Sequence, residues 1–328
     1  MKTIYLKQKV LIRDIEKGDQ NGVIHLLKKV YGSAYYNTQF YKEKVIEHYI
    51  HDAIHKTRRK VYWKVAAHKG KIIGQMMFVI RHGAAFLIFT MVDPDYEGKT
   101  VINSISTEMI KILNEMNQDD MRCIYAFVDE QNVPIKKVLK NYKFKVLGGL
   151  PNFQDGGEIK IYGKLVYDFH WRMINPHIKL SPLIYETVRN ARIPRIVLAN
   201  GMPPQSSEGI EKTEFHIAKE ENSRHCAIKT KAGNTCAKYI EEKNNHLLRD
   251  FIITDKLSFE TKKHLIRFIH AQFQQSSEIK GVSFALHSED VESQWLVLNN
   301  GGQYRAFLPF YLGDKDAVLL YIKKGEEV

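Results

Sequence analysis

One stretch of the chain has the residue types of a phosphate-binding turn. Residues 93–100, Asp-Pro-Asp-Tyr-Glu-Gly-Lys-Thr, follow an apolar run and precede a long amphipathic segment. The first amides of a helix have no intrahelical acceptor and lie at the positive end of its dipole, so they attract anions. Gly98 allows a phosphate to approach the backbone closely, and Lys99 adds a positive charge. These residues predict a phosphate site, with a plain structural turn as the alternative, because any strand–loop–helix connection uses similar residues.

Three other groups of residues are better explained by structure than by chemistry. His51 and His55 are four apart on an expected helix, but no third ligand is evident, so a solvated pair is favoured over a metal site. Cys226 and Cys236 are out of register across an expected hairpin, which favours buried apolar side chains over a zinc site. Residues 56–60 form a basic run that could meet nucleic acid, although cations are also favoured at a helix end. No metal site is predicted.

The apolar pattern of the first half predicts the elements that position the phosphate turn. It alternates between strands and helices late in this half and has an antiparallel hairpin early, which predicts a mixed α/β sheet with helices on both faces. A break is expected at 147–151, where two glycines and a proline stand. The expected strands are 9–15, 60–67, 72–81, 84–92, 122–128 and 158–167, and the expected helices follow Asp19 and cover 38–56, 101–117 and 133–142.

The second half repeats this order more loosely. A shift of 158 positions lays residues 124–153 on 282–311 without a gap, so that Val133 meets Val291. We therefore expect two domains, residues 1–166 and 167–328, with two unrelated α/β domains as the alternative. The expected strands of the second half are 169–173, 214–218, 225–230, 236–240, 247–254, 281–286 and 317–323, its helices are 182–192, 259–273 and 291–298, and a loop is expected at 200–208.

The first half resembles the GNAT superfamily of acyl-CoA N-acyltransferases over about residues 9–167. Two segments carry the resemblance: residues 91–100, a buried strand end with the turn described above, and residues 128–151, with Val-Asp-Glu-Gln-Asn at the start and Gly-Gly-Leu-Pro at the end. The resemblance implies a GNAT-like fold, and the whole chain looks like a tandem pair with a degenerate second domain. It implies acetyl-CoA, or another acyl-CoA, as co-substrate. The residues it implies for binding are Met91, Val92, Gly98, Lys99, Thr100, Val101, Ile102, Asn103 and Asn132.

The pyrophosphate turn departs from the usual family pattern. Glu97 stands where the family has Arg or Gln, Thr100 where it has Gly, and Ile102 where it has Gly or Ala. In the second half, residues 254–261 contain no glycine at all, so a phosphate cradle is not expected there.

The catalytic positions also depart from the family. Leu139 stands where a tyrosine often protonates the departing thiolate, and Tyr142, three residues later, is the expected substitute. The strand 84–92 has no carboxylate, so the expected base is Asp93 at its end, acting through water, with Asp129 as the alternative.

The composition fits a folded protein with an uneven charge. The chain has 328 residues, 44% of them hydrophobic, and a net charge of +12. Residues 1–164 carry 27 Lys and Arg against 17 Asp and Glu, whereas the remainder carries 22 against 20. A basic half attracts a phosphorylated cofactor, nucleic acid, an acidic substrate or a membrane surface, although lysine-rich solvated faces are a simpler explanation.

The expected compartment is the cytoplasm. Three cysteines cannot build a disulfide framework, the first residues lack a hydrophobic signal region, and no apolar run approaches the ~20 residues of a membrane span.

Three functions follow from the sequence. The first is an N-acetyltransferase that moves an acyl group from acyl-CoA to a small-molecule or protein amine by direct attack. The second is a non-catalytic module that senses acyl-CoA or binds another protein. The third is a nucleic-acid-directed protein that uses residues 56–60. Acceptor, acyl length and oligomeric state are not predicted.

Overall fold

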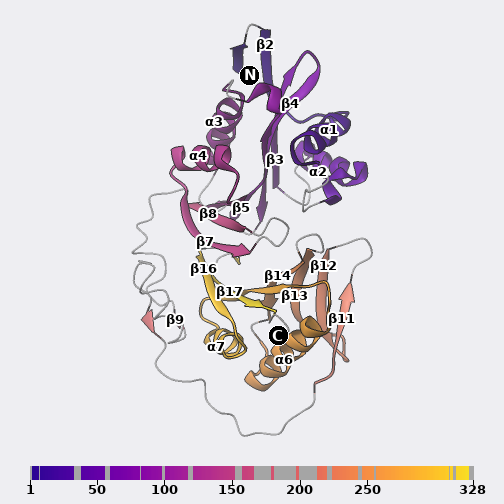
Figure 1. Ribbon diagram of the computed structural model, residues 1–328, viewed down its shortest axis with the longest axis vertical. Coiled ribbons are helices and arrows are strands. Elements are labelled where there is room, and N and C mark those ends of the chain that lie inside the picture. Colours follow the sequence, from indigo (N-terminus) through magenta and orange to yellow (C-terminus); the bar gives the residue numbers. More distant parts are fainter. Residues whose placement is uncertain are drawn as a thin grey trace. The chain divides into compact units, whose positions relative to one another are not determined.

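A computed structural model of the chain shows two compact units (Figure 1). Unit 1 comprises Met1–Leu147 and Gly157–Asp168, and unit 2 comprises Gly148–Gly156 and Phe169–Val328. The structure describes residues 2–6, 8–32, 38–55, 60–81, 83–97, 100–116, 121–151, 157–165, 179–180, 197–198, 213–219, 224–242, 246–254, 256–309, 311–312 and 315–324.

Unit 1 is built around one mixed sheet with the strand order β1-β2-β3-β4-β5-β6-β8. All neighbours are antiparallel except β5 and β6, which are parallel because helix α3 connects them. Its elements are β1 (Lys2–Leu6), β2 (Gln8–Asp14), α1 (Gln20–Tyr31), η2 (Thr38–Tyr41), α2 (Glu43–His55), β3 (Lys60–His68), β4 (Lys71–Arg81), β5 (Ala84–Val92), η3 (Pro94–Tyr96), α3 (Val101–Asn114), β6 (Cys123–Asp129), α4 (Val133–Asn141) and β8 (Glu158–Leu165). Strand β7 (Lys145–Pro151) begins in unit 1 and belongs to unit 2 from Gly148 onward.

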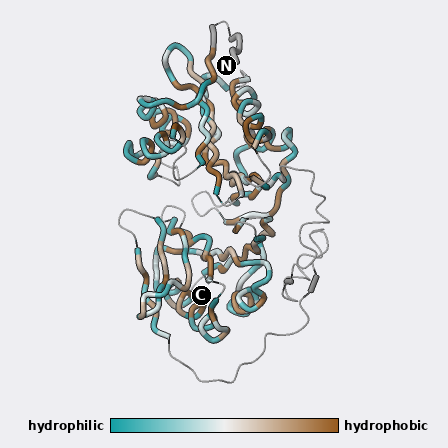
Figure 2. The backbone as a smooth tube through the Cα atoms, turned by 180° about the vertical axis from the view of Figure 1, so that it is seen from behind, coloured by the Kyte–Doolittle hydropathy of each residue, from teal (hydrophilic) through white to brown (hydrophobic). Residues whose placement is uncertain are grey.

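Helices cover both faces of this sheet, as the pattern predicts (Figure 1). On one face, α1 and α2 pack through residues such as Leu27 and Ile46 against buried side chains of β3, β4 and β5. On the other face, α3 packs through Ile105 and Met109 on the central strands, and α4 packs on β6 and β8. Figure 2 shows the helices with teal and brown residues in alternation, which is the amphipathic pattern that buries one face of each.

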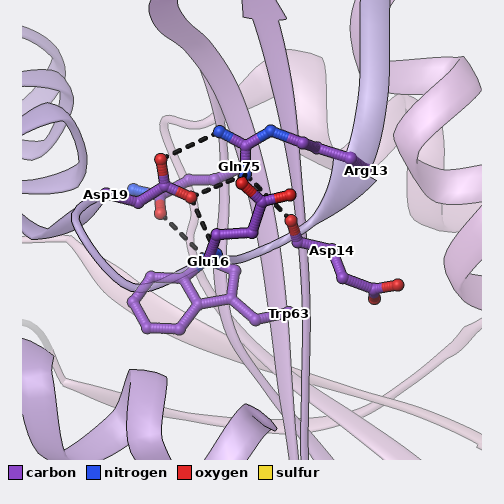
Figure 3. A network of polar contacts seen from close by, with 6 residues as sticks. All are labelled: Arg13, Asp14, Glu16, Asp19, Trp63 and Gln75. Carbon is purple, nitrogen blue, oxygen red and sulfur yellow. Dashed lines mark hydrogen bonds and ion pairs between the residues drawn. The ribbon is translucent and has the colours of Figure 1, made fainter.

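A polar network joins the start of α1 to the sheet (Figure 3). Arg13 at the end of β2 donates two hydrogen bonds to the carboxylate of Asp19, at 2.7 and 2.9 Å, and Asp19 also accepts the amide of Glu16. Below it, the indole of Trp63 donates to the buried side chain of Gln75 at 3.1 Å. The first contacts hold the start of α1 to the end of β2, and the second joins β3 to β4.

Unit 2 has strands in the order β11-β12-β13-β14-β15-β17-β16, which matches the order β2-β3-β4-β5-β6-β8-β7 earlier in the chain. The pair β14 and β15 is again parallel, and α6 connects the two strands. An apolar core forms between this sheet and helices α6 and α7. The elements are β9 (Lys179–Leu180), β10 (Val197–Leu198), β11 (Phe215–Lys219), β12 (His225–Thr230), β13 (Thr235–Glu242), β14 (Leu247–Ile253), α6 (Phe259–Gln275), β15 (Gly281–His287), α7 (Val291–Asn299), β16 (Gln303–Leu308) and β17 (Ala317–Lys323).

Two predictions from the pattern are wrong. The expected helix 38–56 divides into η2 and α2. The expected break at 147–151 lies in strand β7, and Gly148 has a packing role there, since a Cβ atom would lie 1.9 Å from the carbonyl oxygen of Arg305 on β16. Strand β16 and strand β1 were not predicted. The expected elements at 169–173, 182–192 and 200–208 lie outside the described residues.

No helix in the described part of the chain is both long and apolar enough to cross a membrane.

Candidate acyl-CoA site

Strands β5 and β6 part beside the N-terminus of α3. Their pairing runs from Ala84–Cys123 to Leu87–Ala126 and ends there, although β5 continues through residues 88–92. Ile88 is the extra residue of a bulge, because Leu87 and Phe89 face the consecutive residues Phe78 and Met77 of β4. A bulge increases local twist and turns a strand away from its neighbour. Residues 88–92 therefore have no pairing with β6 on that edge.

The predicted residues Met91 and Val92 lie on this part of β5. Met91 is buried, and its sulfur accepts a hydrogen bond from the side chain of Gln75 at 3.3 Å. Val92 is half-buried and pairs with Gly74 of β4. The network of Trp63 and Gln75 thus reaches the strand end that the resemblance assigns to the acyl-CoA.

The N-terminus of α3 is held close to the sheet by a glycine. At Gly74, a Cβ atom would lie 3.0 Å from Cδ1 of Ile105 and 3.1 Å from Cγ1 of Val101. Val101 and Ile105 are fully buried, so the first turn of α3 lies directly on β4 beside the separated strands. Gly74 was not predicted as part of the site, although a glycine inside a strand pattern signals a close approach.

Thr100 precedes α3 in a left-handed conformation, with φ 61° and ψ 1°. A β-branched residue rarely adopts this conformation, and such strain is concentrated at functional sites. Among the predicted phosphate-binding residues, Thr100, Val101, Ile102 and Asn103 form this turn, and Ile102 and Asn103 are at least partly exposed. Gly98 and Lys99 lie outside the described residues.

The turn before α3 is tied to α1 and β3. Asp93 accepts the amide of Asp95 at 3.0 Å and starts η3. Lys29 on α1 lies 2.7 Å from Asp93 and 2.6 Å from Asp95, and these hydrogen bonds raise the pKa of Lys29. On the other side, His68 contacts the hydroxyl of Tyr96 at 2.8 Å. The predicted base Asp93 is therefore also an anchor of the turn, a contact that spacing could not reveal.

Asn132 stands at the N-terminus of α4. Its side-chain oxygen accepts the amide of Ile135 at 3.3 Å, so it caps the helix. The side-chain NH₂ is not used by the cap and is chemically suited to donate to a ligand carbonyl. Asp129, the alternative base, accepts the amide of Gln131 at 2.7 Å.

Tyr142 lies at the end of α4, with its hydroxyl toward α3. The hydroxyl is 3.2 Å from Oγ1 of Thr107 and 3.5 Å from the carbonyl oxygen of Asn103. Leu139, at the position of the family's tyrosine, is 3% exposed and belongs to the core under α4. The structure thus brings Tyr142 to the first two turns of α3, next to the predicted phosphate-binding turn.

No group of His, Cys, Asp and Glu side chains that could hold a metal ion occurs among the residues that the structure describes. The cysteines Cys226 and Cys236 are both buried, and Cys226 pairs with Tyr239 across the hairpin.

Comparisons with known proteins give the following similarities. Solved structures with a similar chain include a PaiA N-acetyltransferase from Thermoplasma acidophilum in complex with coenzyme A (18% identity, TM-score 0.39, covering 48% of this chain and 98% of the other). An N-acetyltransferase from Staphylococcus aureus Mu50 gives 20% identity, a TM-score of 0.40, and coverage of 48% and 99%. No curated protein matches. The sequence model of the acetyltransferase (GNAT) family matches residues 23–144, which run from within α1 to three residues past the end of α4. Unit 1 therefore contains a domain that matches the acetyltransferase (GNAT) family model, and its fold is mixed α/β.

Proposed function

We propose that unit 1 transfers an acyl group, most simply acetyl, from acyl-CoA to a primary amine by direct attack. The observation that carries the proposal is the separation of β5 and β6 beside the N-terminus of α3, in a domain of the GNAT family. Five residues of β5 extend past the last pair and span about 17 Å at ~3.3 Å per residue. Backbone groups on such an edge bind an extended ligand as an added strand would, which suits the two amides of a pantetheine arm.

The residues of the first turn of α3 would hold the pyrophosphate. The amides of Val101, Ile102 and Asn103 lie at the positive end of the helix, and Thr100 precedes them. Gly98 and Lys99, which come before Thr100 in the sequence, would add to this site. Asn132 would donate its side-chain NH₂ to the acyl-CoA arm. Met91 and Val92 would supply the backbone contacts of β5, and an amide of this segment would stabilise the oxyanion that forms when the amine attacks.

Two side chains would move the protons. Asp93 would accept a proton from the amine through a water molecule, and Tyr142 would protonate the departing thiolate. The amine nitrogen bonds to the acyl carbon as the carbon–sulfur bond breaks, so one proton leaves the nitrogen and one reaches the sulfur. Acceptor and acyl length are open within this proposal.

A carboxylate placed in the first turn of α3 tests the pyrophosphate site. We expect Asn103→Asp to raise the stability of the helix by about 0.3–1 kcal/mol, because a negative charge is favourable at a helix N-terminus. The same charge should weaken acetyl-CoA binding about tenfold in calorimetric titration, because it repels the pyrophosphate. The matched control is Asn141→Asp, which makes the same change at the far end of the exposed face of α4. Equal affinity for wild type and N103D would contradict the proposed site.

One observation favours a second function, a non-catalytic acyl-CoA sensor. Leu139 lies in the core where relatives place the acid, and the hydroxyl of Tyr142 is held by α3. A panel of primary amines with acetyl-CoA separates the two functions, since release of free CoA with any amine supports the enzyme and binding without release supports the sensor. Strongly salt-dependent RNA binding would instead support the nucleic-acid function.

We also propose that residues 167–328 form a degenerate copy of the domain in residues 1–166. The strand order of the two sheets is the same, and each has one parallel pair connected by a helix. Unit 2 differs in having only residues 220–224 between β11 and β12, where unit 1 has α1 and α2 between β2 and β3.

A further inference from the structure

From α3 onward, equivalent elements of the two units begin a constant number of positions apart in the sequence. Helices α3 and α6 begin at Val101 and Phe259, 158 positions apart, and strands β6 and β15 begin at Cys123 and Gly281 with the same offset. Helices α4 and α7 follow the same offset at both ends. Each residue of the acyl-CoA site after Thr100 therefore has a definite counterpart in unit 2.

The free strand edge is shorter in unit 2. The last pair of β14 and β15 is Phe251–Phe284, and Phe284 is the counterpart of Ala126, where pairing ends in unit 1. Beyond this pair β14 continues for residues 252–253, about 7 Å at ~3.3 Å per residue, and not for the five residues found in β5. The turn that follows is also shorter, with residues 254–258 in place of 93–100.

A side chain of unit 2 uses the backbone amide at its bulge. Asp250 lies at the bulge of β14 with φ 56°, and its amide donates to the buried hydroxyl of Ser283 on β15 at 3.1 Å. Its carboxylate accepts the hydroxyl of Tyr311 at 2.9 Å and the Nε–H of Arg249 at 3.2 Å. The backbone amide at the bulge of β14 therefore donates to a side chain of unit 2 itself. In a transferase, an amide at this position would be needed as a donor to the substrate.

A buried lysine fills the space between α6 and α7. The ammonium of Lys262 lies 2.8 Å from Asp290 and 3.0 Å from Glu292. The Lys262 side chain is 6% exposed and that of Asp290 9%. Lys262 is the counterpart of Ser104 on α3, and Asp290 is the counterpart of Asn132, the residue that the resemblance assigns to the acyl-CoA arm. Asp290 keeps the helix cap, since it accepts the amide of Ser293 at 3.2 Å, but adds a charge that Lys262 neutralises.

We infer that unit 2 has replaced its ligand with its own side chains: the ion cluster of Lys262, Asp290 and Glu292 takes the place between the two helices that acyl-CoA takes in unit 1. The chain then binds one acyl-CoA, in unit 1 only. This inference rests on the proposed function of unit 1 and on the common register of the two units. The ion cluster joins α6 to α7 where a ligand would otherwise lie. Unit 2 therefore holds these two helices together without a bound ligand.

The test combines stability with stoichiometry in the full chain. Lys262→Met keeps the length of the side chain and removes its charge, which leaves Asp290 and Glu292 without their cation. We expect its thermal midpoint to fall by about 10 °C, because breaking a buried ion pair is strongly destabilising. The matched control is Lys263→Met, since Lys263 is a more exposed neighbour paired only with Glu260 on the same helix, and its midpoint should change by less than about 2 °C. If Lys262→Met does not fold, the same measurements are made on Asp290→Asn, which places the asparagine of unit 1 at this position.

Calorimetric titration with coenzyme A should give one equivalent per chain in wild type and in K262M, with unchanged affinity. Two equivalents in wild type, or weaker CoA binding in folded K262M or D290N, would overturn the inference. If wild type binds no CoA, the proposed function of unit 1 fails. The thermal midpoints then still test the role of the ion cluster. A midpoint of K262M equal to that of K263M overturns this role, and a midpoint about 10 °C lower than that of wild type supports it.

Discussion

Asp93 has two possible roles, and its partner Lys29 separates them. The carboxylate anchors the turn before α3 and is also the proposed base. We expect Asp93→Asn to lower kcat about 100-fold, as for the loss of a general base. Steady-state kinetics with acetyl-CoA and a reactive amine measures this effect.

Lys29→Met is the matched control for this residue. It removes the ion pairs of Lys29 with Asp93 and Asp95 and keeps both carboxylates. We expect a higher KM for acetyl-CoA, because the turn is less well held, with kcat and its pH profile unchanged. If D93N behaves like K29M, Asp93 positions the turn and is not the base.

Tyr142 is the proposed acid, and its hydroxyl contacts α3. We expect Tyr142→Phe to lower kcat about 100-fold because the thiolate loses its proton donor. The lost hydrogen bond should cost only about 1 kcal/mol of stability in chemical denaturation. Thr107→Val removes the partner of the hydroxyl and keeps the hydroxyl itself, so kcat should stay within a few-fold. Equal kcat in wild type and Y142F would exclude the tyrosine as acid.

At the scale of elements, the contact between α3 and β4 positions the predicted phosphate turn. Gly74→Ala would place a methyl group 3.0–3.1 Å from Ile105 and Val101, so the first turn of α3 must move away from the sheet. We expect a loss of about 1–3 kcal/mol in unfolding free energy and weaker acetyl-CoA binding. Gly157→Ala is the control, because no atom lies within 4 Å of a Cβ there. Unchanged affinity in a destabilised G74A would show that the turn does not depend on this packing.

The elements that could be predicted from sequence are those with a strong period. The stripe containing Ile105 and Met109 predicted α3, and the polar turn at Lys69 and Gly70 predicted the hairpin of β3 and β4. The offset of 158 predicted α7 from α4. Strand β7 was missed because Gly148 serves close packing against β16 and not a turn, and the local sequence does not distinguish the two cases.

The site was less predictable than the fold because its geometry depends on distant residues. The bulge at Ile88 is defined by how β5 pairs with β4, which the residues around Ile88 alone do not reveal. The separation of β5 from β6 could therefore not be predicted from this segment. The ion pairs of Lys29 join residues 64 and 66 positions apart, and the bond from Gln75 to Met91 joins neighbouring strands. Tyr142 was identified from its place in a resemblance, and its contacts with Thr107 and Asn103 came only from the packing of α4 against α3.

At the scale of the molecule, each unit has its own apolar core. The core clusters under α1 to α4 contain residues of unit 1 only, and the cluster under α6 and α7 contains residues of unit 2 only. Most of the positive charge lies in residues 1–164, with 27 basic and 17 acidic residues. Acyl-CoA is an anion, so the charge agrees with the proposal that unit 1 binds it. Because the cores are separate, we expect the ligand to stabilise unit 1 alone.

We expect two thermal transitions in scanning calorimetry, of which coenzyme A moves one. A ligand at 100 times its Kd adds about 2.7 kcal/mol to the unit that binds it. For a domain of this size, each kcal/mol raises the midpoint by about 2–4 °C, so the transition of unit 1 should rise by about 8 °C. The transition that does not move should be the one that K262M lowers, because Lys262 belongs to the core region of unit 2. One transition that shifts as a whole would mean that the units unfold together, and two that both rise would mean that unit 2 also binds the ligand.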